Sequence, residues 1–395
     1  MDYIEERRQI PVAGEWDVLV AGGGIAGVAA ALSSARAGAK TLLLEREYML
    51  GGLATAGLIA IYLPLCDGAG HQVSYGIAEE LLRLSIARES KNPPALWLEE
   101  HTAQERKESG RRFDTAYNPW LFALDMERLL LEAGVEIRYG MSVCAVQTEA
   151  GCIRHVVVES KSGREAIAVK AVVDATGDAD ICYLAGEDTE TFQPGNVLAG
   201  WYYTSNGGYH LRAVGSAETP EYLRTANEPA PLEERRFTGL DAGEITDMMV
   251  LSHKHTLAHF EEMRKKDPQA EMASITVIPQ LRMTRRIRGL TEPDHTDAWR
   301  EYDDCVGMIG DWRRRGIAYQ IPMGMLCGEK IDNLFAAGRC AAGKDGFWEA
   351  MRVIPCCAVT GEAAGLAAAL WNGGRDTKKV QEALLARGIP LNFAK

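Results

Sequence analysis

A glycine-rich turn near the start of the chain most constrains how it can fold. Gly22, Gly24 and Gly27 lie in AGGGIAG, after residues 16–21, which predict a buried strand, and before residues 25–37, which predict a helix. In such a turn the first glycine permits a sharp bend, the second lets a phosphate approach the backbone, and the third lets helix and strand pack closely. The helix start offers N–H groups and partial positive charge to phosphates. The pattern therefore indicates a nucleotide-binding βαβ unit.

A carboxylate lies where such a unit would bind a ribose. Residues 41–44 predict a second buried strand, and Glu45 ends it about 20 residues after the glycines. A carboxylate there accepts hydrogen bonds from the adenosine ribose and disfavours a 2′-phosphate, so NADP fits poorly. The alternative is a glycine-rich turn without a ligand, but the strand, helix and acid together argue against it.

The rest of the chain divides into core-like and less regular stretches. Residues 135–177 alternate in strand-like runs, which predicts a β-meander before another buried strand. Residues 190–319 lose this rhythm and predict a long helix near 242–266 and a strand at 274–278. Core character then returns, with a helix that starts near Pro355. The chain therefore leaves its core fold and comes back to it.

Several blocks of the sequence resemble, in the same order, those of a known family. The blocks are PVAGEWDVLVAGGGIAG, EREYMLGGLATAGL, AVVDATGDADICYLAG, LRMTRRIRG, YQIPMGML, DNLFAAGRCAAG and MRVIPCCAVTGEAAGLAAAL. Over nearly its whole length the chain resembles the bacterial FAD-dependent oxidoreductase family of the glutathione-reductase-like FAD-binding superfamily. The resemblance implies an enzyme with FAD as its cofactor.

The resemblance also implies an α/β fold with two parts. A Rossmann-type FAD-binding domain, whose parallel sheet carries a β-meander insertion, would be discontinuous and comprise residues 1–60, 119–189 and 320–395. Residues 61–118 and 190–319 would form a second, α+β domain that caps the substrate.

The adenosine end of FAD is assigned by the same resemblance. Glu45 and Arg46 would hold the adenosine, and the backbone of Val143 would pair with adenine. Thr176 and Gly177 would line the adenosine–pyrophosphate side. The first-turn residues expected to contact FAD are Gly22, Gly24, Ala26 and Gly27.

The flavin end is assigned to three further segments. Gly338 and Arg339 would contact the ribityl chain or pyrophosphate. Arg352, Val353 and Ile354 would begin a helix aimed at the pyrimidine edge of the flavin, because a helix N-terminus stabilises the negative charge of reduced flavin. The loop that passes under the pyrophosphate and ribityl chain would consist of Gly51, Gly52, Leu53, Ala54 and Thr55.

The sequence holds one full GxGxxG motif. The segment GDADIC lacks the required glycines, so a separate NAD domain is not expected. Electrons would therefore enter from a small-molecule substrate or leave to an electron acceptor that the sequence does not identify.

The segment 61–76 follows the flavin-approaching loop and supplies candidate acid–base groups. Asp67, His71 and Tyr75 lie in it, and His71 is the main catalytic candidate, because histidine exchanges protons near neutral pH. The alternative is a solvated loop histidine. A covalent histidine–flavin link rests on proximity alone.

Arginines in LRMTRRIRG are the second set of catalytic candidates. Strand alternation would place Arg282 and Arg286 on one face, where they could bind a carboxylate bidentately. Structural salt bridges are an equal alternative. Met283 stands where the related motif leads us to expect an acid, which weakens the case for an acid–arginine pair there.

Metal chemistry is not expected. His255 and His259 have metal-like spacing on a predicted helix, but no HExxH motif surrounds them, and a solvated helix face is favoured. The nine cysteines are scattered without a CxxC pair, so buried reduced thiols are expected, Cys356 and Cys357 included.

Charge and hydropathy narrow the function further. The chain of 395 residues has a formal charge of −12, which argues against nucleic-acid and anionic-membrane partners. We see no signal peptide and no run long enough to span a bilayer, so a cytoplasmic location is expected. The oligomeric state stays open.

The leading functional prediction is hydride transfer between FAD and a small, polar organic substrate. One alternative is a double-bond reductase similar to fumarate reductases. The other is an FAD-binding partner or RNA-modification component, against which the acidic charge counts. Substrate, direction of reaction and covalent state of the flavin are not readable from the sequence.

Overall fold

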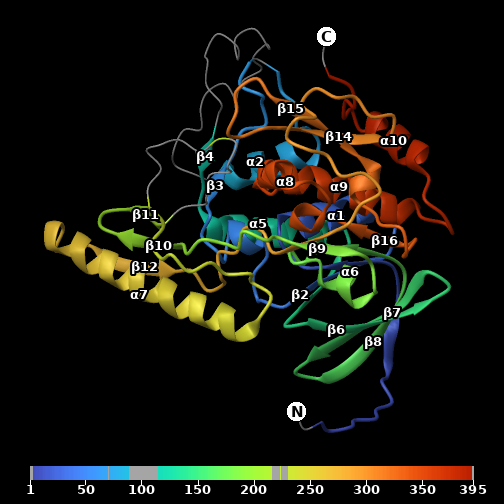
Figure 1. Ribbon diagram of the computed structural model, residues 1–395, viewed down its shortest axis with the longest axis horizontal. Coiled ribbons are helices and arrows are strands. Elements are labelled where there is room, and N and C mark those ends of the chain that lie inside the picture. The colour runs from blue at the N-terminus through green and yellow to red at the C-terminus, as the bar shows by residue number, and fades with distance from the viewer. Residues whose placement is uncertain (1–2, 70, 89–113, 216–222, 224–229, 394–395) are drawn as a thin grey trace.

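A mostly parallel sheet organises the molecule (Figure 1). The computed structural model describes residues 3–69, 71–88, 114–215, 223 and 230–393. Within them the central sheet has seven strands, in which β1, β2, β5, β8 and β16 run parallel and β6 and β7 extend β8 as an antiparallel meander. In spatial order they are β5 (Glu136–Tyr139), β2 (Thr41–Glu45), β1 (Val12–Ala21), β8 (Gly163–Asp174), β7 (Cys152–Ser160) and β6 (Ser142–Glu149), with β16 (Leu334–Ala336) beside the end of β8.

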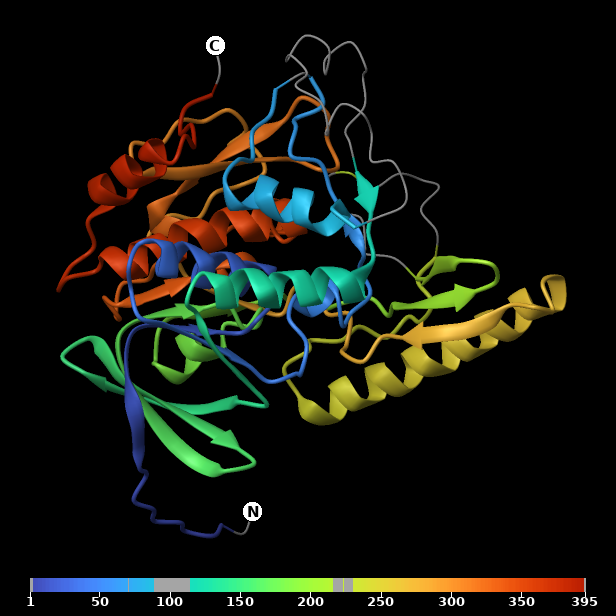
Figure 2. The same ribbon diagram turned by 180° about the vertical axis from the view of Figure 1, so that it is seen from behind.

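A layer of helices covers the sheet on the side away from the meander (Figure 2). These helices are α1 (Ile25–Arg36), α2 (Ile77–Ile86), α5 (Pro119–Glu132), α9 (Ile354–Leu370) and α10 (Thr377–Ala386). Helices α1 and α9 approach with almost no side chain between them. A Cβ on Gly361 would lie 2.2 Å from the carbonyl oxygen of Ala26, and one on Gly365 would lie 2.1 Å from that of Ala30. Small residues on both helices therefore set their spacing.

A second unit of helix and sheet projects to one side of this core (Figure 1). The strands β11 (Tyr209–Val214), β10 (Gly200–Ser205) and β12 (Glu271–Ile275) form an antiparallel sheet, and α7 (Ala242–Lys266) runs beneath it. The carboxylate of Asp241 accepts the Glu244 N–H at 2.9 Å and caps α7. The helix predicted near 242–266 is confirmed.

The strand predicted at 274–278 is displaced toward the N-terminus. β12 covers Glu271–Ile275, and the chain then leaves the sheet. The physical reason is that the next backbone donors bind elsewhere, since the Val277 N–H donates to the Ala56 carbonyl at 3.2 Å. This detour carries residues 276–281 to the core.

The remaining elements are short. They are β3 (Ile61–Tyr62) paired with β4 (Thr115–Ala116), β9 (Thr189–Thr191) paired with β13 (Arg285–Ile287), β14 (Cys305–Gly310) paired with β15 (Ala318–Pro322), α6 (Asp180–Leu184), α8 (Asp345–Met351), and the 3-10 helices η1 (Gly52–Ala54), η3 (Met323–Met325) and η4 (Gly338–Cys340). The domain boundary predicted between residues 319 and 320 falls inside β15 and so divides the β14–β15 hairpin. β14 itself packs against α9 of the core. None of the helices described combines the length and apolar character needed to cross a bilayer.

Candidate functional site

A cavity of about 260 Å³ lies where the carboxyl ends of β1, β2 and β8 meet. Open α/β sheets bind ligands at this edge. Its walls come from the first glycine turn, the loop after β2, the meander, the loop after β8 and the start of α9. The predicted FAD contacts that line it are Gly22, Gly24, Ala26, Glu45, Arg46, Gly51, Gly52, Leu53, Ala54, Val143, Thr176, Gly177, Arg339, Arg352 and Ile354.

The three glycines of the first turn meet different surroundings. Gly22 has a φ of 99°, and a Cβ there would lie 2.5 Å from the Ala175 carbonyl oxygen. A Cβ on Gly27 would lie 1.8 Å from the Gly22 carbonyl oxygen, where helix and strand touch. By contrast, a Cβ on Gly24 would meet no described heavy atom within 4 Å. Gly24 leaves bare backbone beside open space at the start of α1, which suits a diphosphate.

Glu45 is buried at the end of β2 and lines the cavity. Its two carboxylate oxygens accept backbone N–H groups from Gly23 at 2.6 Å and from Glu47 at 2.8 Å. Burial raises the pKa of Glu45, and these two hydrogen bonds oppose the rise. Each carboxylate oxygen can accept two hydrogen bonds and has one here, so one lone pair on each remains for ribose hydroxyls.

Some predicted FAD contacts lie behind the cavity wall. They are Gly27, Thr55, Gly338 and Val353, which are not among the lining residues. The Thr55 hydroxyl is turned to the Leu50 carbonyl oxygen, to which it donates. Gly338 has a φ of 62°, and a Cβ there would lie 2.7 Å from the Ala26 side chain. These residues shape the wall rather than face the cavity.

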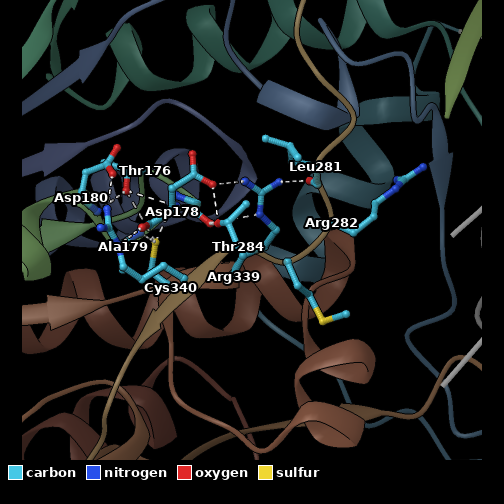
Figure 3. Close-up of polar contacts among 12 residues, drawn as sticks. Thr176, Asp178, Ala179, Asp180, Leu281, Arg282, Thr284, Arg339 and Cys340 are labelled. Carbon is cyan, nitrogen blue, oxygen red and sulfur yellow. Dashed lines mark hydrogen bonds and ion pairs between the residues drawn. The ribbon is translucent and has the colours of Figure 1, made fainter. Parts of the chain in front are cut away.

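Arg339 joins the loop after β8 to the segment before β13 (Figure 3). Its Nη1 donates to the Leu281 carbonyl at 2.8 Å, and its Nε donates to the Gly177 carbonyl at 3.3 Å. Nη2 forms an ion pair with Asp178 at 3.4 Å. Although Arg339 lines the cavity, these donors serve protein acceptors, so the predicted contact with ribityl or pyrophosphate stays a prediction.

A cysteine holds the same loop from behind. The sulfur of Cys340 accepts backbone N–H groups from Gly177 at 3.0 Å and Ala179 at 3.3 Å (Figure 3). Burial raises the pKa of the Cys340 thiol, so it stays protonated. All nine cysteines fall within the described residues; they are free and seven are buried, as the sequence predicted.

Sequence reasoning missed part of the cavity lining. The missed residues include Asp178, Asp180, Ile278, Pro279, Leu281 and Cys357. Burial, followed by the nearby charge of Asp178, raises the pKa of Asp180 to about 6, and Arg285 pairs with Asp180 at 2.7 Å. The available signal was GDADIC itself, whose carboxylates directly follow the predicted Thr176 and Gly177 contacts.

A buried arginine–glutamate–arginine group lies beside the start of α9. Glu349 accepts from Arg352 at 2.7 and 2.6 Å and from Arg313 at 2.7 Å. The two guanidinium groups hold the pKa of Glu349 below its ordinary value despite the burial, which acts to raise it. Arg352 lines the cavity, so the triad presents net positive charge at the expected flavin end.

The predicted catalytic residues do not come together. His71 does not line the cavity; its Nδ1 lies 3.0 Å from Oδ2 of Asp67, and its side chain is 47% exposed. Arg286 forms buried ion pairs with Glu292 at 2.6 Å and Glu190 at 3.2 Å. That is the structural alternative foreseen for these arginines.

The prediction that Arg282 and Arg286 lie on one face of a strand is wrong. β13 spans only Arg285–Ile287, so strand alternation does not extend back to Arg282. The backbone before β13 binds the Asn196 side chain instead, whose Oδ1 accepts the N–H groups of Arg282 at 2.7 Å and Met283 at 3.0 Å. The two arginines therefore have different neighbours.

The histidines of α7 serve different partners. His255 Nε2 lies 2.8 Å from Glu233, whereas His259 Nδ1 lies 2.8 Å from the Tyr202 hydroxyl. In the part of the chain that the structure describes, no group of three or more potential ligands from His, Cys, Asp and Glu is placed to hold a metal ion.

A family model of FAD dependent oxidoreductases matches residues 17–200 and 205–386. The chain belongs to this FAD-dependent oxidoreductase family. FAD is accordingly its cofactor, and the predicted α/β fold with a Rossmann-type FAD-binding domain is confirmed.

One solved structure agrees with that fold. The oxidoreductase is similar to a geranylgeranyl bacteriochlorophyll reductase-like protein from Thermoplasma acidophilum, with 15% identity and a TM-score of 0.50 over 95% of this chain and 84% of that one. A flavin-dependent brominase is similar with 13% identity and a TM-score of 0.46, over 94% of this chain and 84% of the other. At 15% identity the likeness to the reductase-like protein shows the fold alone.

The cavity fits FAD in this FAD-dependent oxidoreductase. Gly24 provides the bare backbone that a pyrophosphate needs, and Glu45 keeps lone pairs for ribose hydroxyls. Arg352 supplies positive charge at the opposite end. Adenosine and flavin would therefore lie at the β2 end and the α9 end of the cavity respectively.

Proposed function

We propose that this oxidoreductase transfers a hydride between FAD and a small, polar organic substrate. Bound FAD would supply the redox chemistry. The observation that best supports this proposal is that one cavity is lined by the loop Gly51–Ala54, by Arg352 and by Leu281 of the segment leading to β13. A substrate held beside Arg352 would lie between the FAD-binding part and the cap, where such enzymes commonly bind ligands.

The surrounding side chains suggest how a substrate is received. Ile278, Pro279 and Leu281 form an apolar wall that would keep water from the reacting carbon. Arg352, oriented by Glu349, would favour negative charge that develops nearby. The proposal gives His71 no role, because its partly exposed side chain is paired with Asp67 away from the cavity.

An anaerobic screen tests the proposal. Polar metabolites are added in groups to the FAD-loaded protein, and bleaching of the flavin absorption is followed, with free FAD as the control. A substrate should bleach the protein-bound flavin alone. Reduced protein that is reoxidised by an enoate would instead identify the double-bond reductase. A flavin that no organic donor reduces and no organic acceptor reoxidises would contradict hydride transfer.

A further inference from the structure

Arg282 is a buried cation with an unused hydrogen-bond donor. The residue is 8% exposed, and its Nε has no acceptor among the described residues. Within the described part of the chain its one side-chain hydrogen bond is long, from Nη2 to Oε1 of Gln280 at 3.4 Å, and the Trp201 ring centroid lies 5.7 Å from its Cζ. A buried guanidinium ordinarily pairs with an anion, and no described residue supplies one to Arg282.

The acids nearby are already engaged. Glu349, whose charge reaches Arg282, is bound by both Arg352 and Arg313. Burial, reinforced by the charge of Arg352, lowers the pKa of Arg282 to about 9. The side chain therefore remains charged at neutral pH. Arg286 makes a useful contrast, because its Nε also has no acceptor in the described ranges but its charge is balanced by two carboxylates.

The structure holds Arg282 firmly next to the wall of the cavity, although Arg282 is not itself a lining residue. Its backbone N–H is bound by Asn196, and the Gln280 side chain donates to the Gly57 carbonyl at 2.6 Å, just beyond the flavin-approaching loop. The preceding Leu281 lines the cavity, as does Arg352. Figure 3 shows the Arg282 side chain directed away from Asp178 and Arg339. Because the charges of Arg352 and Glu349 act on Arg282, it lies nearer the expected flavin end of the cavity than the adenosine end.

We infer that Arg282 binds a carboxylate group of the substrate. This inference rests on the proposed function and narrows its polar substrate to a carboxylic acid. The planar guanidinium offers parallel N–H donors that match a carboxylate, and its single uncompensated charge suits a monoanion. The ring of Trp201 lies beside the same group and would flank the substrate. The phosphates of FAD are the other source of an oxyanion, and the test separates the two.

Calorimetric titration of the oxidised, FAD-loaded protein tests the inference without turnover. The probes are acetate and benzoate, each compared with its amide, and the visible spectrum of the flavin is recorded in parallel. We expect the carboxylates to bind and perturb the spectrum, and the amides to bind at least about tenfold more weakly. Arg282→Gln should remove this preference, whereas Arg282→Lys should keep part of it. Arg288→Gln is the control, because Arg288 lies on the same segment and is 62% exposed.

The outcomes separate this inference from the proposed function. Equal binding of carboxylates and amides by the unaltered protein would overturn the inference, and this comparison needs no variant to fold. Loss of FAD from Arg282→Gln, with unchanged carboxylate binding, would also overturn it and assign Arg282 to the cofactor. Carboxylate binding that depends on Arg282 would support it even if no acid bleached the flavin, and only hydride transfer would then fail.

Discussion

At the scale of single residues, neighbouring positions of one motif carry opposite constraints. A side chain at Gly24 would enter open space, whereas one at Gly27 would collide with the Gly22 carbonyl. The sequence pattern predicted both roles, because turn, helix start and close packing are local features. It could not distinguish Arg282 from Arg286. Arg286 is neutralised by Glu190 and Glu292, and the tertiary fold is what brings these two acids beside it.

Gly24→Val should fold but bind little FAD. Gly24 has a φ of −65°, which valine adopts, and the added side chain would occupy the proposed pyrophosphate position. Gly27→Ala should instead lose folded protein, because its methyl group meets backbone. Circular dichroism and flavin absorbance per mole of purified protein measure the two effects. Full flavin occupancy in folded Gly24→Val would show that the pyrophosphate lies elsewhere.

Asp180 should make folding stability depend on pH. Its pKa rises from 3.8 to about 6 on folding, so the folded state holds this proton more tightly than the unfolded chain. Its contribution to stability is therefore present at low pH and is lost as the pH rises from about 4 to about 6. Asp180→Asn, which resembles the protonated acid, should raise the urea midpoint of the apoprotein more at about pH 7 than at about pH 5. An equal change at both pH values would contradict the raised pKa.

At the scale of elements, the α1–α9 contact positions both ends of the cavity. α1 begins at the glycine turn, and α9 begins beside Arg352. The sequence predicted each helix from its composition, but not that they touch, because they lie more than 300 residues apart. It also misplaced β12, since the hydrogen bond from Val277 to Ala56 joins distant segments.

Gly365→Ala should destabilise the protein by about 1–3 kcal/mol, because its methyl group would overpack a helix contact at which a Cβ lies 2.1 Å from the Ala30 carbonyl. Gly374→Ala is a matched control, since a Cβ there meets no described atom within 4 Å. Chemical unfolding of both apoproteins gives the comparison, and FAD affinity should fall only in Gly365→Ala. Equal stability of the two variants would mean that the helices separate without cost.

At the scale of the whole molecule, the cavity gathers segments from both expected domains. The resemblance predicted this discontinuous plan, and its division into a core and a cap remains a prediction. The sequence did not predict the β14–β15 hairpin across the boundary near residue 320, because a strand pair has no distinctive local signal when its strands are buried and short.

FAD should stabilise the molecule as one unit. Ligand at about 100 times its dissociation constant adds about 2.7 kcal/mol to the folded state. Thermal unfolding followed by tryptophan fluorescence should therefore shift upward with added FAD in a single transition, because Leu281 and the glycine turn line one cavity. Gly24→Val should show no shift. A separate transition that is insensitive to FAD would show that the cap does not share the cofactor site.

The distance in sequence between Gly24 and Arg352 has a consequence for biosynthesis. On the ribosome, the glycine turn emerges long before α9, the helix against which α1 packs. Until α9 is made, a nascent chain has only the α1 side of the cofactor site, and Ala26 and Ala30 face solvent instead of Gly361 and Gly365. We therefore expect FAD to bind only after α9 has been made, and chains stalled before β16 to be colourless.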